Sequence, residues 1–157
     1  MTLNYQIDST DLAIIQELQK DARKPFLEIA RKLNVSGGTI HQRYLKMQEL
    51  GVIKGSHLEV DLKKLGFNME IILGIHLKSA KDNEKVIQKL KRLNEITEIY
   101  FTTGNYALLI KITVKDIDHF HEFLVKKLQA IPEVDSTESF ISLARPLKRE
   151  LDIEAFL

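Results

Sequence analysis

The stretch "NVSGGTIHQRYLKMQELGVI", residues 34–53, decides the fold of the first third of the chain. Its apolar residues follow helical spacing, and Gly51 stands where a glycine commonly ends a helix. Because Ser36 is a good N-cap, a helix is predicted from there to Gly51. Gly37 and Gly38 then fall in its first turn, where the backbone N–H groups have no helical partners and can face an anion.

Two further helices are predicted before this one. Asp8 is a good N-cap for a first helix over residues 9–22, and Pro25 suits the first turn of a second helix that ends near Leu33. Only residues 34–35 separate the second helix from the third, so the two helices must cross sharply. This arrangement is typical of a helix-turn-helix, whose second helix enters the major groove of DNA.

The charge pattern supports that interpretation. The net charge of the chain is +1, but six basic residues and one acid between residues 23 and 46 give a local +5, which favours a polyanion. On the third helix, Arg and Gln side chains suit base edges, and Thr and Lys suit phosphates. The predicted DNA-binding residues are Ser36, Gly37, Gly38, Thr39, Gln42, Arg43, Lys46 and Lys54. A solvated helix face in a protein-docking module fits the helix and charge pattern as well.

Residues 52–62 change to a strand-like alternation, on which Lys54 and His57 could contact the phosphate backbone as a wing. The motif "KKLGF" then interrupts the pattern. We therefore expect a DNA-binding domain with a strand linker over residues 1–61 and a second domain over residues 62–157.

The second domain alternates strands and helices in the order βαββαβ. That order predicts a ferredoxin-like fold, with four antiparallel strands and both helices on one face. Apolar residues on both faces of the strands predict an apolar uncovered face that pairs with another subunit. The fold class is thus α+β, a winged helix-turn-helix domain followed by a ferredoxin-like domain. Strands are expected over residues 67–78, 96–103, 106–114 and 134–147, and helices over 82–93 and 116–131.

A candidate ligand loop lies in "YFTTGNY", residues 100–106. Gly104-Asn105 is by itself a signal for a tight hairpin. The flanking hydroxyls, aromatic rings and turn N–H groups are also the groups that would hold an amino-acid carboxylate and a small side chain. The candidates are Tyr100, Thr102, Thr103, Gly104, Asn105 and Tyr106.

Other classes of protein find little support. The chain has no cysteine, which excludes disulfides, thiolate zinc sites and a cysteine nucleophile. His119 and His121 would point to different sides of a helix, and no glycine-rich phosphate loop, nucleophile elbow or HExxH motif is present. We therefore expect no enzyme, no catalytic residue, no metal and no cofactor. Without a signal peptide or a long apolar run, a cytoplasmic location is expected.

Five stretches together resemble the Lrp/AsnC, or feast/famine, transcriptional regulators, and look closest to the asparagine-responsive AsnC branch. The resemblance implies binding to double-stranded DNA, a C-terminal domain that binds a small amino-acid effector, dimers formed through the sheets and an octameric ring of four dimers. The stretches, in chain order, are "IDSTDLAIIQELQKDAR", "IARKLNVSGGTIHQRYLKMQELGVIKG", "LGIHLKSAKD", "EIYFTTGNYALLIKI" and "STESFISL".

The resemblance also implies that polar residues of the last helix and strand line the effector pocket between dimers. These are Gln129, Ser136, Thr137 and Glu138. One departure is Ala107, where many relatives carry an acid that could pair with an α-ammonium group. The expected ligand is asparagine or another small amino acid, and the alternative is an architectural DNA-binding protein without a ligand response.

Overall fold

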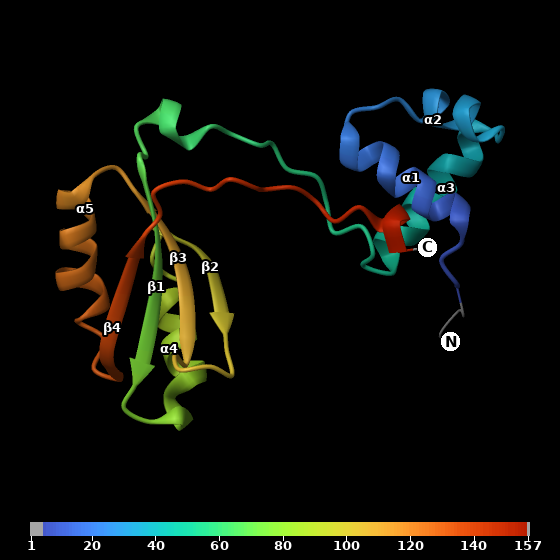
Figure 1. Ribbon diagram of the computed structural model, residues 1–157. Coiled ribbons are helices and arrows are strands. Elements are labelled where there is room, and N and C mark those ends of the chain that lie inside the picture. The colour runs from blue at the N-terminus through green and yellow to red at the C-terminus, as the bar shows by residue number, and fades with distance from the viewer. Residues whose placement is uncertain (1–4, 157) are drawn as a thin grey trace. The chain divides into compact units, whose positions relative to one another are not determined.

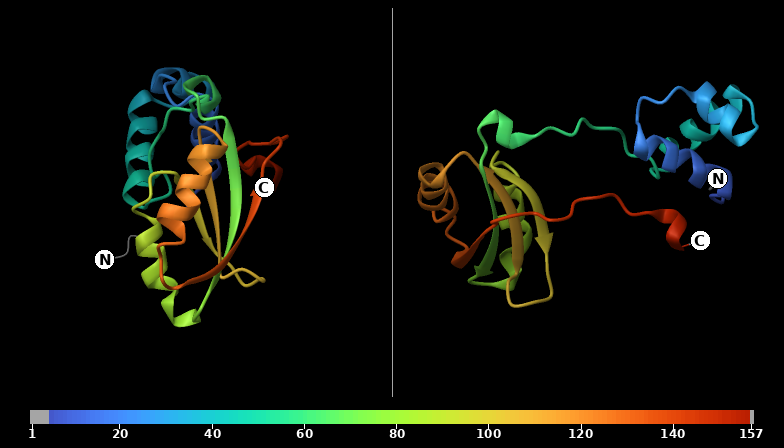
Figure 2. Two further views of the ribbon diagram at one scale, coloured as in Figure 1. Left: turned by 90° about the vertical axis from the view of Figure 1, so that its left-hand side faces the viewer. Right: turned by 45° about the horizontal axis from the view of Figure 1, so that its top comes forward.

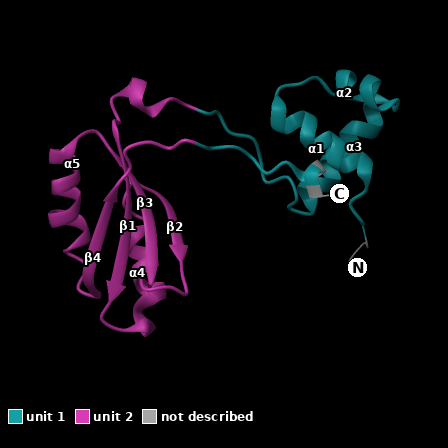
Figure 3. Ribbon diagram, in the orientation of Figure 1, with its two compact units in different colours: residues 1–59, 147–157 teal, residues 60–146 magenta. Residues whose placement is uncertain are grey.

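The computed structural model describes residues 5–156. The chain divides into two compact units (Figure 3). One consists of residues 1–59 with 147–157, and the other of residues 60–146. Each unit has its own hydrophobic core.

The N-terminal unit is built from α1 (Ser9–Lys20), α2 (Phe26–Leu33) and α3 (Gly37–Glu49) (Figure 1). The Asp8 side chain accepts a hydrogen bond from the N–H of Asp11, whose carboxylate accepts from the N–H of Asp8, so α1 starts with a capping box. The apolar faces of the three helices meet in one small core. Its buried residues are Ile14, Ile29, Ala30, Ile40 and Met47.

The turn between α2 and α3 is as short as predicted. Asn34 adopts a left-handed conformation with a φ of 54°, and the N–H of Val35 donates to the Ala30 carbonyl at 3.0 Å. Ser36 then caps α3, because its side chain accepts a hydrogen bond from the N–H of Thr39. At the other end of α3, Gly51 has a φ of 71°, which confirms the predicted glycine stop.

The predicted strand over residues 52–62 is wrong, because the structure has no strand in this segment. The N–H of Ile53 donates to the Met47 carbonyl at 3.1 Å, and its side chain packs on the helical core. Gly55, with a φ of 151°, then breaks the alternation. The segment is extended, but it has no neighbouring strand within the described chain with which to form a ladder. The predicted wing is therefore not a β-structure here.

The last residues also depart from the expected division of the chain. Residues 147–157, placed above in the second domain, belong to the first unit. The Lys148 ammonium group lies 3.0 Å from Glu59 Oε1, and the closing 3-10 turn, Ile153–Phe156, contacts α1. These contacts explain why a tail that follows the last strand groups with the helices.

The C-terminal unit has a four-stranded antiparallel sheet with the strand order β2-β3-β1-β4. Figure 2 shows both helices on one side of this sheet, so the predicted ferredoxin-like arrangement is confirmed. Its elements are β1 (Met69–Leu77), α4 (Asn83–Leu90), β2 (Ile96–Phe101), β3 (Leu108–Val114), α5 (Ile117–Glu122) and β4 (Val134–Ile141).

The second helix of this unit changes its winding. After α5 the chain continues as a π-helix, Phe123–Leu128, and the N–H of Gln129 donates to the Leu124 carbonyl five residues back at 2.9 Å. The wider turn places Phe123 and Leu128 together in the core, both fully buried. A regular α-helical spacing predicts that Ile117 lies in the core and Phe123 does not. In the structure Ile117 is 56% exposed, and Phe123 takes a core position.

The uncovered face of the sheet is less apolar than predicted. Alternation places Ile72, Leu109 and Phe140 on this face, but Lys111 lies among them. The Lys111 ammonium group lies 3.0 Å from Glu98 Oε1, and it also lies 3.4 Å from a carboxylate oxygen of Glu70. Because the cross-strand pair is ionic, the face combines apolar patches with a charged centre.

Two buried carboxylates connect the halves of this unit. Glu95 immediately precedes β2 and binds Lys127 and His119 from the second helix. Glu133 immediately precedes β4 and binds Lys85 and Lys89 of α4, each at 2.6 Å. The two lysines lower the pKa of Glu133 to about 2. Each carboxylate therefore pairs with cations from the helix of the other half.

Candidate nucleic-acid interface and ligand site

The start of α3 offers open backbone donors. In an α-helix each N–H group donates to the carbonyl four residues back, and for Gly37 and Gly38 that residue lies before α3. Their N–H groups therefore have no partner within the helix. A Cβ at Gly38 would meet only Ser36 Oγ, at 3.7 Å, so the surface beside it is open. A Cβ at Gly37 would lie 2.9 Å from Leu27 Cδ2, so this glycine lets α2 approach closely.

The outer face of α3 carries polar side chains around this start. The Thr39 hydroxyl lies 2.9 Å from the Ser36 hydroxyl, and Gln42 is exposed one turn further on. Lys46 lies on the same side and forms a surface ion pair with Glu49 at 3.0 Å. A pair of this kind contributes little to stability, so the lysine can exchange its partner for a phosphate. These residues are positioned as the sequence predicted.

Arg43, another predicted DNA-binding residue of α3, forms ion pairs with α1. Its Nη1 donates to Asp8 Oδ2 at 2.8 Å and to Asp11 Oδ1 at 2.9 Å. The two carboxylates raise the pKa of the guanidinium group, so it stays charged. With 29% of its side chain exposed, Arg43 connects α3 to α1, and its predicted contact with a base edge stays a prediction.

The local charge excess is also smaller than the sequence suggested. Glu17, buried on α1, binds both Lys24 and Lys32. Hydrogen bonds from these two lysines lower the pKa of Glu17 to about 2. Four of the six basic residues counted between residues 23 and 46 therefore pair with acids, all of which lie outside that window, while Arg23 and Arg31 form no ion pair within the described chain.

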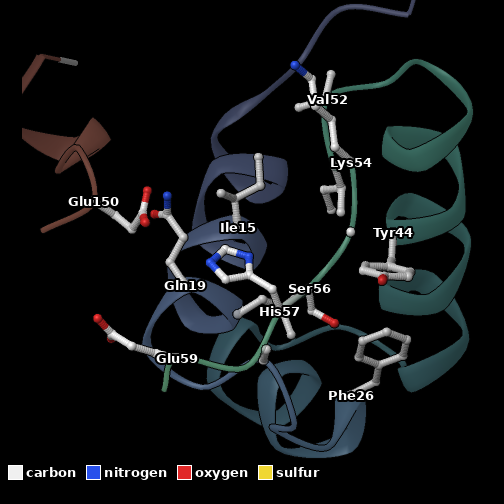
Figure 4. Close-up of a pocket in the computed structure, with 14 residues that line it drawn as sticks. Ile15, Gln19, Phe26, Tyr44, Val52, Lys54, Ser56, His57, Glu59 and Glu150 are labelled. Carbon is white, nitrogen blue, oxygen red and sulfur yellow. The ribbon is translucent and has the colours of Figure 1, made fainter. Parts of the chain in front are cut away.

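Lys54 lies at a cavity rather than on a wing. The cavity, about 540 Å³ in volume, lies beside α1 in the N-terminal unit (Figure 4). Ile15, Phe26 and Tyr44 supply apolar walls, and Glu150 of the tail lies at its rim. Most of the segment from Val52 to Glu59 lines this cavity, including Lys54 and His57, the two predicted wing residues.

The C-terminal unit gathers an aromatic and polar group around Tyr106. The Tyr106 ring lies against Gly74, where a Cβ would come within 2.5 Å of it. Its centroid is 5.1 Å from the His76 ring and 6.3 Å from the Phe140 ring. Its hydroxyl donates to a carboxylate oxygen of Glu138, and this hydrogen bond raises the pKa of Tyr106.

The loop that carries Tyr106 is wider than the predicted two-residue hairpin. Residues 102–107 separate β2 from β3, and Gly104 does not have the positive φ that a tight turn requires. The Thr102 hydroxyl donates to the Tyr106 carbonyl, and the N–H of Thr102 donates to the Ala107 carbonyl at 3.2 Å. The loop is therefore held by its own residues and by the packing of Tyr106 on the sheet.

The other predicted effector residues divide into two sets. Ser136 and Glu138 pair with His76 and Gly74 in the sheet, so they share the face on which Tyr106 lies. Thr137 alternates to the helix side, and Gln129 ends the π-helix. Tyr100 donates to Glu98 instead, and no hydrogen bond from the side chains of Thr103 and Asn105 is present in the described chain. The prediction of these residues as a site stays a prediction.

Three residues that surround Tyr106 were not predicted from the sequence, namely Gly74, His76 and Phe140. A glycine inside the strand pattern "LGIHL" was an available signal, because such a glycine often marks a close approach. Within residues 5–156, no three metal-binding side chains converge as a metal site requires. In the same range, no helix is both long and apolar enough to cross a membrane.

Comparison with known proteins covers both units. Residues 7–48 match the AsnC-type helix-turn-helix domain, and residues 70–151 match the Lrp/AsnC ligand binding domain. The regulatory protein AsnC of Haemophilus influenzae is 46% identical over 94% of this chain and 98% of its own length. That of Escherichia coli K12 is 42% identical over 94% of this chain and 97% of its own.

Solved structures give the same result. The Escherichia coli AsnC structure has a TM-score of 0.90 and 41% identity, covering 94% of this chain and 99% of its own. A transcriptional regulator from Neisseria meningitidis, solved with L-Met, has a TM-score of 0.90 at 18% identity and covers 97% of this chain and 100% of its own, which supports the fold. The chain therefore belongs to the Lrp/AsnC family of transcriptional regulators.

Proposed function

We propose that the chain is a sequence-specific DNA-binding transcriptional regulator whose DNA affinity or assembly is modulated by a small amino acid. The observation that carries this proposal is the match of residues 7–48 and 70–151 to the two domains of AsnC-type regulators, together with 46% identity to a regulatory protein AsnC over 94% of the chain. The proposal describes a binding protein and involves no catalysis. A cytoplasmic location follows from this role, because the DNA is there.

For DNA, the proposed contact surface is the start and outer face of α3. The open N–H groups of Gly37 and Gly38 and the dipole of the helix favour a phosphate. Beyond them, Gln42 is exposed and suits a base edge. The proposed contact residues are Ser36, Gly37, Gly38, Thr39, Gln42 and Lys46, together with Lys54 in the segment that follows α3.

For the effector, the proposed site is the group around Tyr106 and the loop of residues 102–107. Aromatic rings and a carboxylate close together suit a small zwitterion, whose α-ammonium group could pair with Glu138. This carboxylate offers an alternative to the acid that many relatives carry at the position of Ala107. The Neisseria meningitidis neighbour, solved with L-Met, supports an amino acid as the class of ligand. Asparagine is the first ligand to test.

Assembly is part of the same proposal. Away from the Tyr106 group, the uncovered sheet face combines Ile72 and Leu109 with the Lys111 ion pairs, and this part is suited to pair with a second copy. We propose a dimer formed through this face and an octamer of four dimers. A ligand that binds between dimers then favours the closed ring and changes the spacing of the DNA-binding units.

Two measurements test the proposal. Selection of bound duplexes from a random-sequence pool, with and without asparagine, should enrich one motif and show a change on addition of the ligand. Titration calorimetry with each common amino acid, combined with light scattering, should show binding together with a change of assembly. Enrichment of no motif would refute sequence-specific binding, and an amino acid that binds without altering assembly or DNA affinity would refute modulation.

The alternative is an architectural DNA-binding protein that senses no ligand, since it would share the α3 surface. Thermal unfolding separates the two, because a ligand that binds only the folded state raises the melting temperature. No shift with any common amino acid would favour the architectural role.

A further inference from the structure

Arg43 joins the middle of α3 to the start of α1. Its Nη1 bonds to Asp8 at 2.8 Å and to Asp11 at 2.9 Å. The Asp11 carboxylate is fully buried and also accepts a hydrogen bond from the Tyr5 hydroxyl at 2.8 Å. Because Asp8 and Asp11 form the capping box of α1, the guanidinium group binds to a rigid point on that helix.

We propose that Arg43 and Asp11 are positioning residues, which set the orientation of α3 for DNA without contacting the DNA. The inference rests on the DNA-binding function proposed above. The remaining contact between α1 and α3 is apolar, through residues such as Ile14 and Ile40. Apolar packing fixes how close two helices come but is not directional, whereas charge-assisted hydrogen bonds fix a direction.

The burial of Asp11 argues against release of Arg43 to DNA. If the guanidinium group moved to a base or a phosphate, Asp11 would keep its hydrogen bonds from Tyr5 and from the N–H of Asp8. It would lose its only cation within the described chain while fully buried. Removal of one member of a buried ion pair is strongly unfavourable, so DNA would have to offset that cost before any gain in binding.

The competing possibility is a direct contact between Arg43 and a phosphate or base, and the two make opposite predictions for Asp11→Asn. A positioning role predicts that loss of the Asp11 charge loosens α3 and weakens DNA binding. A direct contact predicts equal or tighter binding, because the substitution removes a carboxylate that competes for Arg43.

The test measures the affinity of the full chain for a duplex that the wild-type protein selects from a random pool, at several salt concentrations. We expect Asp11→Asn and Arg43→Ala each to weaken binding by roughly tenfold, with an unchanged slope of log Kd against log salt. The double variant should be about as weak as either single variant, because both break the same network. A slope reduced by about 1 in Arg43→Ala, or full affinity in Asp11→Asn, would overturn the proposal.

Two further variants separate positioning from general loss of stability. Ile14→Val lies in the same core and the same helix but leaves the ion pairs intact, so it should lower the melting temperature and keep the DNA affinity. Tyr5→Phe removes one hydrogen bond to Asp11 and keeps all charges, so it should fold even if Asp11→Asn does not, and it should weaken binding by about two- to fivefold. Unchanged DNA affinity in both Tyr5→Phe and Asp11→Asn would refute the positioning role and leave the proposed DNA-binding function intact. A wild-type chain that selects no duplex would refute the proposed function as well.

Discussion

Glu17 is a buried charged residue that links two parts of the N-terminal unit. Its side chain is 6% exposed on α1, and it accepts hydrogen bonds from Lys24 before α2 and Lys32 within α2. A buried carboxylate is stable only with such partners, because transfer of an unpaired charge out of water is costly. One side chain therefore holds the loop between α1 and α2 as well as α2 itself.

Glu17→Gln should lower the free energy of unfolding at pH 7 by about 1 to 3 kcal/mol, because both lysines lose their charged acceptor. The pKa of Glu17 is lowered to about 2 in the folded state, from an ordinary 4.5. Its contribution is therefore complete above pH 4.5 and is lost as the pH falls towards 2. Urea unfolding at pH 7, 5 and 3 should show a flatter pH dependence in the variant. Glu28→Gln, on the surface of α2, is the control and should stay within about 0.5 kcal/mol of wild type.

The two glycines at the start of α3 form a matched pair for a second prediction. Gly38→Ala meets open space and should raise stability by up to about 1 kcal/mol. Gly37→Ala should gain less, because its Cβ must displace Leu27 Cδ2 at 2.9 Å, although that side chain is 63% exposed and can move. Both should weaken DNA binding if a phosphate approaches this backbone. Urea unfolding and fluorescence anisotropy measure the two effects, and intact DNA binding would limit the recognition surface to Thr39 and beyond.

At the scale of elements, local sequence signals predicted most helices and strands. The segments predicted incorrectly are those whose structure depends on contacts with other parts of the chain. The caps at Asp8 and Ser36 and the glycine stop at Gly51 act within a few residues, so the sequence was sufficient to locate them. A strand at residues 52–62 needs a neighbouring strand, and the described chain provides none. The π-helix after α5 depends on the packing of Phe123, which periodicity alone does not reveal.

The candidate sites follow the same rule. The exposed polar face of α3 could be predicted, because a helix fixes which side chains share a face. The ion pairs of Arg43 could not, since its partners Asp8 and Asp11 lie more than thirty residues away in the sequence. The group around Tyr106 likewise depends on the register between β1 and β4, which places Gly74 opposite Glu138.

Gly74→Ala tests how β1 supports the ligand loop. The new Cβ would come within 2.5 Å of the Tyr106 ring, so the ring and its loop must move, while the sheet hydrogen bonds of β1 remain. Hydrogen exchange should therefore be faster at the amides of Thr102 and Ala107, which are now bonded at 3.2 and 3.0 Å. Amino-acid binding should weaken in parallel. Gly104→Ala, where a Cβ meets nothing within 4 Å, should leave these exchange rates unchanged.

At the scale of the whole molecule, the chain carries two separate cores connected by covalent segments at both ends of the C-terminal unit. Residues 147–157 return to the N-terminal unit after β4, so two stretches of chain pass between the units (Figure 3). β4, which carries Ser136 and Glu138, is therefore followed along the chain, after residues 142–146, by a segment of the N-terminal unit.

Separate cores predict separable unfolding. In differential scanning calorimetry of the full chain, Glu17→Gln should lower the transition of the N-terminal unit, and Glu133→Gln should lower that of the C-terminal unit, each by several degrees. The reason is that each carboxylate binds lysines only of its own unit. If either substitution shifted both transitions equally, the two cores would have to unfold as one.

Glu95 and Glu133 each bind cations from the opposite β-α-β half, and this limits how the C-terminal unit can be divided. Each half carries one of these buried carboxylates, so a half that is separated from the other has a carboxylate without its cationic partners. A fragment ending in the loop between β2 and β3 should therefore remain unfolded by itself and should gain structure when the complementary fragment is added. The same requirement is met when the second half comes from another copy, so exchange of halves between chains would retain every one of these ion pairs.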